Sequence, residues 1–229
     1  MDGFPFPVEV IRSARRQKTA HISLNGSGVR VRVPLHVTDR WIQEFVHSKS
    51  RLIEDKLQQN TAVVKKPAKT YATGEPLSYL GIEYILDVVR APVESVALVD
   101  NQLVVGLEHT EDALWVKHLV VSWYLHEAIG LFGAKVKQFS PVIGVKPRRM
   151  KVRDYKSRWG SCSIHGDLTF NLRLMMAPPE VIDYVVIHEL CHMVEHNHSP
   201  RFWSAVKTHQ PDFKAHQHWL KTHGSDLQF

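Results

Sequence analysis

The segment Val185-Val186-Ile187-His188-Glu189-Leu190-Cys191-His192 (VVIHELCH, residues 185–192) places two histidines four residues apart, with a glutamate directly after the first. On an α-helix, residues i and i+4 lie on one face, about 6 Å apart along the axis. Two imidazole rings in that arrangement can reach one zinc ion at about 2.0–2.1 Å per bond. Glu189 would lie beside the ion, where its carboxylate can take a proton from water. The spacing therefore predicts a helix with two zinc ligands and a general base.

The residues before this motif favour a helix with a buried body. Pro178-Pro179-Glu180 is typical of a helix start. The apolar residues of the following turns are Val181, Ile182, Val185 and Val186. Polar side chains in such a helix are costly to bury unless they have partners. A metal ion is such a partner, so we prefer a metal site to two unrelated surface histidines.

A catalytic zinc site has a third protein ligand and keeps one position open. His196 and His198 compete for that role. On a continued helix His196 would lie about 12 Å from His188, too far for both to bind one tetrahedral ion. Asn197 can end the helix, and Ser199-Pro200 is typical of the next helix start, so His198 falls in a tight corner. The predicted ligands are His188, His192 and His198, with His196, Glu195 and more distant residues as alternatives.

Length and composition predict one large domain or two small ones, because the chain has 229 residues. Its two cysteines form no disulfide framework. The first ten residues lack the pattern of a secretory signal, and no stretch approaches the roughly 18 uncharged apolar residues of a membrane span. We therefore expect a cytoplasmic protein without a membrane partner.

The first half of the chain combines short strands with one helix. The predicted strands are residues 21–24, 29–33, 79–86 and 103–105. Asn25-Gly26-Ser27-Gly28 has the composition of a turn between the first two. Thr38 or Asp39 can cap a helix that runs to about Gln59, and residues 61–70 are predicted to be a linker.

The second half is richer in helices. A long helix is predicted from Glu111 or Asp112 to about Phe139, with Pro141 and Gly144 ending it. The remaining predicted elements are strands at 150–155 and 168–174, a loop at 158–163, and helices at 179–195, 200–208 and 212–223. The fold class is therefore α+β, with a β-rich N-terminal portion at residues 1–110 and a hydrolase core at residues 111–229.

The positive net charge of the chain is consistent with a polyanionic partner. The net charge is +6, and Lys146–Arg158 holds seven basic residues and one acid, Asp154. This run is either a solvated strand and loop or a surface that faces phosphates. Two further hypotheses follow: a metal-dependent nucleotide pyrophosphatase or phosphohydrolase in which the run and Arg173 hold the polyphosphate, and a protein that works near nucleic acid.

Three residues outside the motif are candidates for substrate binding. Arg158 and Arg173 can bind a carboxylate or phosphate of the substrate, although ordinary salt bridges also explain them. Asn171, on a predicted strand beside the metal helix, can hydrogen-bond to a substrate backbone. For the outer imidazole nitrogens, Asp183, Glu195 and backbone carbonyls are candidate acceptors.

Several segments together resemble one known family. They are Ser157-Arg158-Trp159-Gly160-Ser161-Cys162, Phe170–Leu174, Ala177–Val186 leading into His188–His192, and Asn197-His198-Ser199 with Phe202-Trp203. These residues are similar to the YgjP-like zinc metallopeptidases and, more distantly, to the SprT- and WLM-type minimal zincins. The likeness is dense from about Val152 to Gly224. It implies a zincin-like core of the metallopeptidase type, a Zn²⁺ cofactor, and the same three histidine ligands with Glu189 as general base. The partner that we expect is a peptide or protein substrate, or a nucleotide under the alternative hypothesis.

Overall fold

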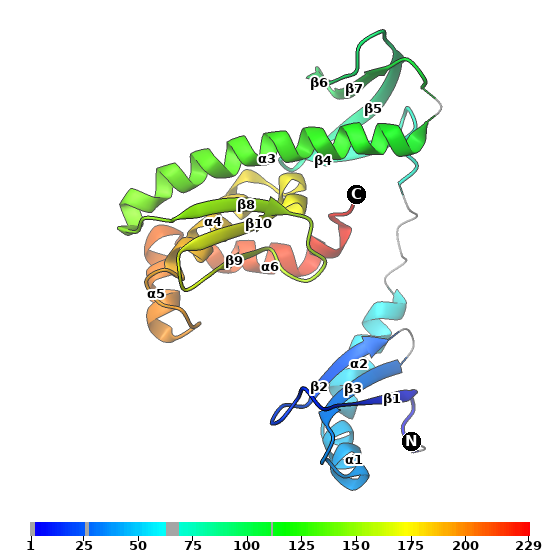
Figure 1. Cartoon of the computed structure of the whole chain (residues 1–229), viewed down its shortest axis with the longest axis vertical. Helices are drawn as coiled ribbons and strands as arrows, with labels where there is room; N and C mark the ends of the chain where they lie inside the picture. Colours follow the sequence, from blue (N-terminus) through cyan, green and yellow to red (C-terminus); the bar gives the residue numbers. More distant parts are fainter. Residues whose placement is uncertain (1–2, 26–27, 63–68, 111) are drawn as a thin grey trace. The chain divides into compact units, whose positions relative to one another are not determined.

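The computed structural model describes residues 3–25, 28–62, 69–110 and 112–229, without the side chains of residues 59–62. The two central residues of the predicted turn (26–27), most of the predicted linker and Glu111 lie outside this part of the chain. The structure forms two units, residues 1–67 and 68–229 (Figure 1). Each unit has its own hydrophobic core.

The N-terminal unit contains one sheet and two helices. Its elements are β1 (Val8–Ser13), β2 (His21–Asn25), β3 (Gly28–Pro34), α1 (Asp39–His47) and α2 (Ser50–Ala62). The strand order is β1-β3-β2, with β1 parallel and β2 antiparallel to β3. Alternate residues of β3, Val29, Val31 and Val33, share a core with Ile42 and Val46 of α1, so the helices cover one face of the sheet.

The prediction of a single helix over residues 38–59 was wrong, because the helix is interrupted between α1 and α2. The hydroxyl of Ser48 donates to the carbonyl of Phe45, and that of Ser50 donates to the carbonyl of His47. Such side-chain bonds compete with the helical hydrogen bonds. Thr38 caps α1 as predicted, by accepting from the N–H of Trp41.

The second unit begins with a four-stranded sheet. Its strands are β4 (Pro76–Tyr79), β5 (Ile82–Arg90), β6 (Ser95–Val99) and β7 (Gln102–Leu107), in the order β4-β5-β7-β6. The strand predicted over 79–86 is instead two strands joined by a turn at Leu80-Gly81, whose φ angles are 51° and 80°. A Cβ on Gly81 would lie 3.0 Å from the Cα of Pro178, so this turn packs closely against the start of the histidine-bearing helix.

The boundary between the two units lies after residue 67, whereas the boundary predicted from the sequence was at residue 110. The reason is that Leu86, Leu103 and Val105 of the four-stranded sheet share one core with the long helix that follows. Contacts between distant segments therefore join the region of residues 69–110 to the part that carries the histidines.

The long helix α3 (Ala113–Ile143) lies beside a second, three-stranded sheet (Figure 1). Asp112 caps it by accepting from the N–H of Trp115, and Gly144 ends it in the left-handed region at φ 80°. The strands are β8 (Arg149–Arg153), β9 (Gly160–Cys162) and β10 (Asp167–Asn171), in the order β8-β10-β9. The loop predicted for 158–163 thus contains β9, an edge strand antiparallel to β10.

The strand predicted over 168–174 ends early, at Asn171. There the side chain of Asn171 accepts from the N–H of Arg173 and begins a 3₁₀ helix, η1 (Leu172–Met176). Four elements complete the chain: α4 (Pro179–Cys191), α5 (Pro200–His209), α6 (Phe213–His223) and η2 (Gly224–Asp226). Helix α4 is central, in contact with α3, α5, α6 and the sheet.

With helices and mixed sheets together, the fold is α+β, as predicted. Among the described residues, no helix combines the length and the apolar character needed to cross a membrane.

Candidate metal centre

Three histidines come together at the end of α4. His188 lies in the last turn of α4, His192 directly follows the helix, and His198 lies between α4 and α5. One side-chain nitrogen from each lies within 4.8 Å of the others, and the Nε2 atoms of His188 and His198 are 3.2 Å apart. His196 does not belong to this group among the described residues. The structure thus brings His198, and not His196, close to the other two histidines, and its role as a metal ligand stays a prediction.

Local hydrogen bonds place His198. Helix α4 ends at Cys191, four residues before the predicted end at Glu195. The side chain of Asn197 accepts from the N–H of Ser199 at 2.9 Å, and Ser199 caps α5 by accepting from the N–H of Phe202. These two bonds fix the chain on both sides of His198.

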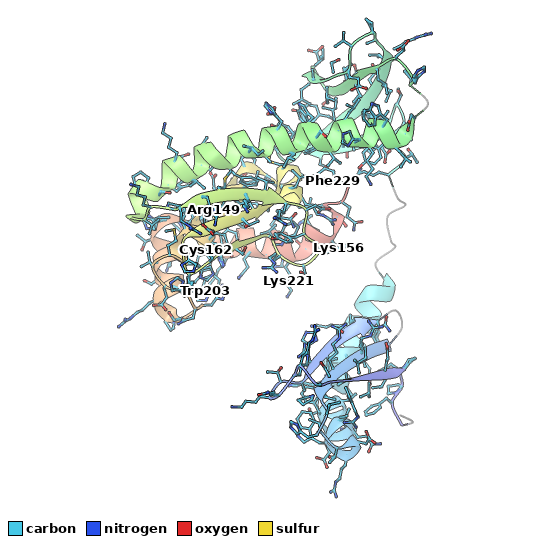
Figure 2. The ribbon with its side chains drawn as sticks, in the orientation of Figure 1. Arg149, Lys156, Cys162, Trp203, Lys221 and Phe229 are labelled. Atoms are coloured by element: carbon cyan, nitrogen blue, oxygen red, sulfur yellow. The ribbon has the colours of Figure 1, made fainter. Side chains whose placement is uncertain are left out.

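Aromatic rings of α5 hold the imidazoles. Phe202 stacks on His192, with ring centroids 4.4 Å apart and an interplanar angle of 24°. Trp203 stacks on His198 at 5.5 Å and the same angle, and also on Phe213 of α6 at 5.3 Å. Figure 2 labels Trp203 in this region. The two aromatic residues after the Ser199-Pro200 helix start thus orient two of the three histidines.

Burial favours the neutral form of His188 and His192. Burial and the neighbouring His192 and His198 lower the pKa of His188 to about 3, and burial also lowers the pKa of His192. The Nδ1 atom of His192 lies 3.2 Å from the carbonyl oxygen of Glu195, so an Nδ1–H donating there leaves the Nε2 lone pair free. Of the predicted acceptors, the backbone of Glu195 fills this role, whereas Asp183 forms an ion pair with Lys135 at 2.6 Å.

The three imidazoles fit a metal ion. Two nitrogens bound to one tetrahedral zinc ion at about 2.0–2.1 Å stand about 3.3–3.4 Å apart, which is close to the 3.2 Å between His188 and His198. Neutral imidazole is the form that binds first-row metals such as zinc, copper, iron and nickel. Both the donor chemistry and the spacing therefore suit a metal held by His188, His192 and His198.

Glu189 is a buried carboxyl group next to this cluster. Glu189 is only 5% exposed. Burial raises the pKa of its carboxyl group to about 8, while the positive charge of Arg158 acts to lower that pKa. The backbone of β9 passes very near: a Cβ on Gly160 would lie 2.6 Å from Oε1 of Glu189. Glycine at position 160 therefore allows the edge strand to approach the carboxylate.

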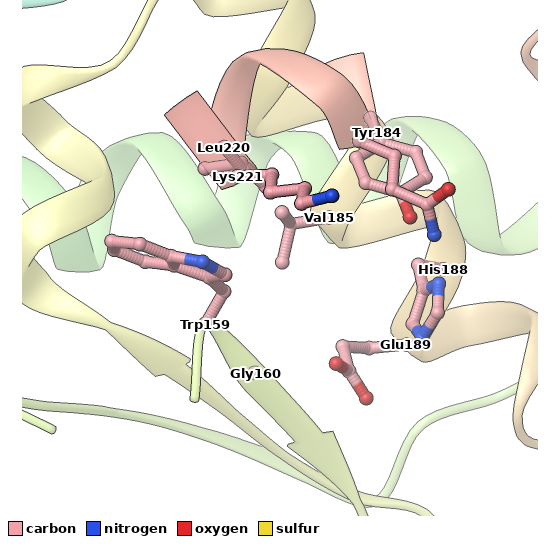
Figure 3. Close-up of a pocket in the computed structure, with 9 residues that line it drawn as sticks. Trp159, Gly160, Tyr184, Val185, His188, Glu189, Leu220 and Lys221 are labelled. Carbon is pink, nitrogen blue, oxygen red and sulfur yellow. The ribbon is translucent and has the colours of Figure 1, made fainter. Parts of the chain in front are cut away.

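A cleft of about 380 Å³ opens onto His188 and Glu189 (Figure 3). Its lining residues are Trp159, Gly160, Tyr184, Val185, His188, Glu189, Gln217, Leu220 and Lys221. Burial, with a smaller effect of Glu189, raises the pKa of Tyr184 to about 12, so its hydroxyl stays protonated at neutral pH. Gln217 and Lys221 could not be predicted as site residues, because they come from α6 and no spacing in the sequence links them to the motif.

The three predicted substrate-binding residues lie in a neighbouring pocket. Arg158, Asn171 and Arg173 line a space of about 410 Å³ that shares Trp159 and Leu220 with the cleft. Arg173 forms a two-bond ion pair with Asp154 at 2.5 and 3.2 Å. The guanidinium of Arg158 lies over the ring of Tyr155, 5.0 Å from its centroid. The structure thus groups these residues beside the cleft rather than inside it.

The amide of Asn171 is occupied by the backbone. Its oxygen accepts from the N–H groups of Tyr155 and Arg173, and its nitrogen donates to the carbonyls of Tyr155 and Arg158. An amide group offers two donors and two acceptor sites, and these four bonds use all of them. Asn171 therefore shapes the chain between β8 and β9.

A histidine cluster beside a buried glutamate, on an α+β scaffold, is an arrangement found in metal-dependent hydrolases. Comparison with known families agrees: the model of the YgjP-like metallopeptidase domain matches residues 18–223, and the chain belongs to this family. The family resemblance noted from the sequence is confirmed, and the protein is a metal-dependent hydrolase of the metallopeptidase type.

Other comparisons add little. No curated protein matches the chain. A solved structure, the metallopeptidase zymogen of Pyrococcus abyssi abylysin, is 22% identical over 33% of this chain and 76% of that chain, with a TM-score of 0.31. A likeness of that extent supports no further conclusion.

Proposed function

We propose that this chain is a zinc-dependent peptidase in which His188, His192 and His198 hold the ion and Glu189 is the general base. One observation carries the proposal: the three imidazoles converge within 4.8 Å of one another, and the carboxylate of Glu189 lines the same cleft as His188. The all-histidine donor set and the H-E-x-x-H spacing favour zinc among the metals that imidazole binds.

The metal, when bound, would polarise the scissile carbonyl and lower the pKa of water. Glu189 then accepts the proton from the attacking water and delivers it to the leaving amine. The protonated hydroxyl of Tyr184 and the ammonium group of Lys221 face the cleft from α4 and α6, where each can donate to an oxygen of the substrate. Figure 3 shows Lys221 and Glu189 entering the cleft from different sides.

The edge strand β9 is suited to align a peptide substrate. It is the last strand in the order β8-β10-β9, so one of its edges has no neighbouring strand in this sheet, and Gly160 lies against Glu189. An extended peptide can add to such an edge through backbone hydrogen bonds. Strand β10, which carries Asn171, has a neighbour on each side and cannot serve in this way. We therefore assign alignment to β9 and a structural role to Asn171.

Arg158 remains the better candidate for an ionic contact with the substrate. It lines the pocket next to the cleft, and its charge acts on Glu189. Arg173, in contrast, is committed to Asp154. An acidic side chain or a terminal carboxylate of the peptide would match Arg158 and Lys156 in that pocket.

The phosphohydrolase alternative gains no specific support from the site. Within the basic run, Arg148 and Arg149 both bind Asp167, at 2.7–3.0 Å. Together with the Arg173–Asp154 pair, these contacts direct basic side chains of the run to carboxylates of the same unit. We therefore retain the peptidase as the proposed function.

The deciding experiment compares the zinc-loaded wild type with Glu189→Gln on casein and a peptide library, and in parallel on nucleoside triphosphates with phosphate release as the readout. We expect the wild type to cleave peptides, and Glu189→Gln to keep its zinc but lose about 10²–10⁴-fold in turnover, the usual contribution of a general base. Glu180→Gln, an exposed change in the first turn of the same helix, is the matched control and should leave turnover unchanged.

Two results would overturn the proposal. Undiminished peptide cleavage by Glu189→Gln would show that Glu189 is not the general base. Release of phosphate from nucleotides that depends on Glu189, without peptide cleavage, would replace the peptidase by a phosphohydrolase on the same site.

A further inference from the structure

The net charge of the chain belongs to the N-terminal unit. Residues 1–67 contain twelve Lys and Arg against six Asp and Glu, whereas residues 68–229 contain seventeen of each. The first unit therefore carries the whole net charge of +6. A domain with such a positive excess attracts polyanions, provided that its cations are gathered on one surface.

The excess is concentrated in one continuous stretch. Residues 10–38 contain no Asp or Glu. The cations of this stretch are Arg12, Arg15, Arg16, Lys18, Arg30 and Arg32, and two histidines, His21 and His36, accompany them. Five of the six are arginines, whose planar guanidinium binds phosphate through two parallel hydrogen bonds.

The fold brings four of these cations, Arg15, Arg16, Lys18 and Arg32, to one end of the sheet. Arg15, Arg16 and Lys18 lie on the segment between β1 and β2. Arg32 of β3 is in register with Ile11 of β1 and His21 of β2, so it lies next to the strand ends from which this segment leaves. Val31 and Val33 face the core, so Arg32 faces away from the helices.

Part of this surface is available for a ligand. Arg12 and Arg30 are paired with Asp39 and Glu9. In the described part of the chain, no ion pair involves the cations of the connecting segment or Arg32. Arg15 and Lys18 are exposed, so their charges are open to an external anion.

An exposed aromatic ring shares a pocket with one of these cations, Lys18. Trp41 of α1 is 43% exposed and stacks on Phe45, with ring centroids 5.0 Å apart. Trp41 and Lys18 line one pocket of about 370 Å³, together with His36 and the apolar Pro34 and Val37. A tryptophan in a concave site with a neighbouring lysine matches the combination by which proteins bind single strands: stacking for the bases and cations for the phosphates.

We infer that the N-terminal unit binds single-stranded nucleic acid, with one base stacked on Trp41 and the neighbouring phosphates on Arg15, Arg16 and Lys18. Charge complementarity and the pocket beside Trp41 carry this inference. A single strand fits better than a duplex, because only an unpaired base can enter the pocket. The surface belongs to the N-terminal unit and the proposed zinc site to residues 68–229, and the inference does not depend on the peptidase reaction.

The test measures binding of the full-length protein to a fluorescein-labelled oligothymidylate single strand by anisotropy, at several salt concentrations. We expect Arg15→Ser/Arg16→Ser/Lys18→Ser to lower affinity by more than about tenfold and to reduce the slope of log affinity against log salt by about 2, since each phosphate contact on a single strand contributes about 0.7. Trp41→Ala should lower affinity about tenfold through lost stacking, with little change in the slope. Trp41→Phe keeps a ring and should retain most of the affinity.

The matched control changes three cations of the catalytic unit: Lys146→Ser/Lys151→Ser/Arg153→Ser. These lie in the basic run that the sequence analysis considered as a phosphate surface, so equal loss in this variant would overturn the placement. Circular dichroism and thermal melting verify that each variant is folded, and the triple change in the N-terminal unit should leave casein cleavage unaltered.

Three other results would reject the inference. In the first, the N-terminal substitutions leave the affinity for the oligonucleotide unchanged. In the second, the protein binds a duplex of the same length as tightly as the single strand. In the third, it binds vesicles of phosphatidylcholine and phosphatidylserine in equal parts more tightly than the single strand. The last result would identify an anionic membrane surface as the partner.

Discussion

Residues 68–229 contain as many acidic as basic side chains, whereas residues 1–67 have six more basic than acidic ones. In the larger unit, basic residues of the 146–158 run and its surroundings meet carboxylates: Arg148 and Arg149 bind Asp167, and Arg173 binds Asp154. In the smaller unit, Arg15 and Lys18 protrude from a segment without acidic neighbours in sequence.

This difference shows that a basic run in a sequence does not reveal whether its charges are available to bind an external anion. Asp167 lies nine residues beyond the end of the run, and strand pairing between β8 and β10 brings it opposite Arg149. The same chain thus uses cations in two ways: to form ion pairs within a sheet near the candidate metal site and, by our inference, to bind an external polyanion. Four predictions test this division between a catalytic unit and a binding unit.

The largest effect is expected for the third histidine. His198→Ala should lower zinc affinity by more than about 100-fold, because even the loss of a group that supports a ligand costs up to that amount. His196→Ala is the control and should bind zinc like the wild type, since His196 lies outside the cluster. Zinc content by mass spectrometry and competition with a chelator provide the measurement. Equal loss in both variants would mean that His198 is not a ligand.

The next effect concerns the separate cores. Ile42 of α1 is fully buried in the small core, so Ile42→Ala should destabilise the N-terminal unit by about 2–5 kcal/mol. Because residues 68–229 have their own core, zinc binding and casein cleavage should remain as in the wild type. Hydrogen exchange followed by mass spectrometry assigns the loss of protection to one unit. Loss of protection throughout α4 as well would contradict the independence of the two units.

A smaller effect is expected at the contact between β9 and Glu189. Gly160→Ala places a Cβ within 2.6 Å of Oε1 of Glu189, so the carboxylate must move. A displacement of about 1 Å can cost as much as 100-fold in rate, and we expect kcat to fall by about 10- to 100-fold while zinc remains bound.

Gly133→Ala is the control for this substitution. Its Cβ would meet nothing within 4 Å on α3, and the change should stabilise the protein by about 1 kcal/mol through helix propensity. Unchanged kcat in Gly160→Ala would show that Glu189 does not need its present position.

The smallest effect concerns pH. Hydrogen bonds from Arg148 and Arg149 hold the pKa of Asp167 well below its usual range. A carboxyl group with a lowered pKa stabilises the fold above its unfolded pKa, about 3.9, and that contribution is lost as the pH falls below this value. Asp167→Asn should therefore be less stable than the wild type at pH 7, and the difference should shrink towards pH 3. Urea midpoints at both pH values measure it. A difference that is independent of pH would assign the effect of Asp167 to packing rather than charge.

Much of the candidate metal centre could be predicted from the sequence, because its signals are local. Helical spacing puts His188 and His192 on one face, and the stop at Asn197 with the cap at Ser199 places His198 in a corner. These effects act over a few residues along the chain. The structure confirms that the three rings meet, and the family comparison confirms the resemblance.

Tertiary structure decided the features that depend on distant residues. The edge strand β9 exists because it pairs with β10, and the amide of Asn171 is occupied by the backbone of Tyr155 and Arg158. Lys221 reaches the cleft only through the packing of α6 on α4. Likewise, the net charge of each unit can be assigned only once the boundary after residue 67 is known: the larger unit is neutral overall, and the smaller one carries the positive excess. Strand pairing, ion pairs and domain boundaries depend on contacts between residues far apart in the chain, whereas the spacing and capping of a helix are contained in the order of neighbouring residues.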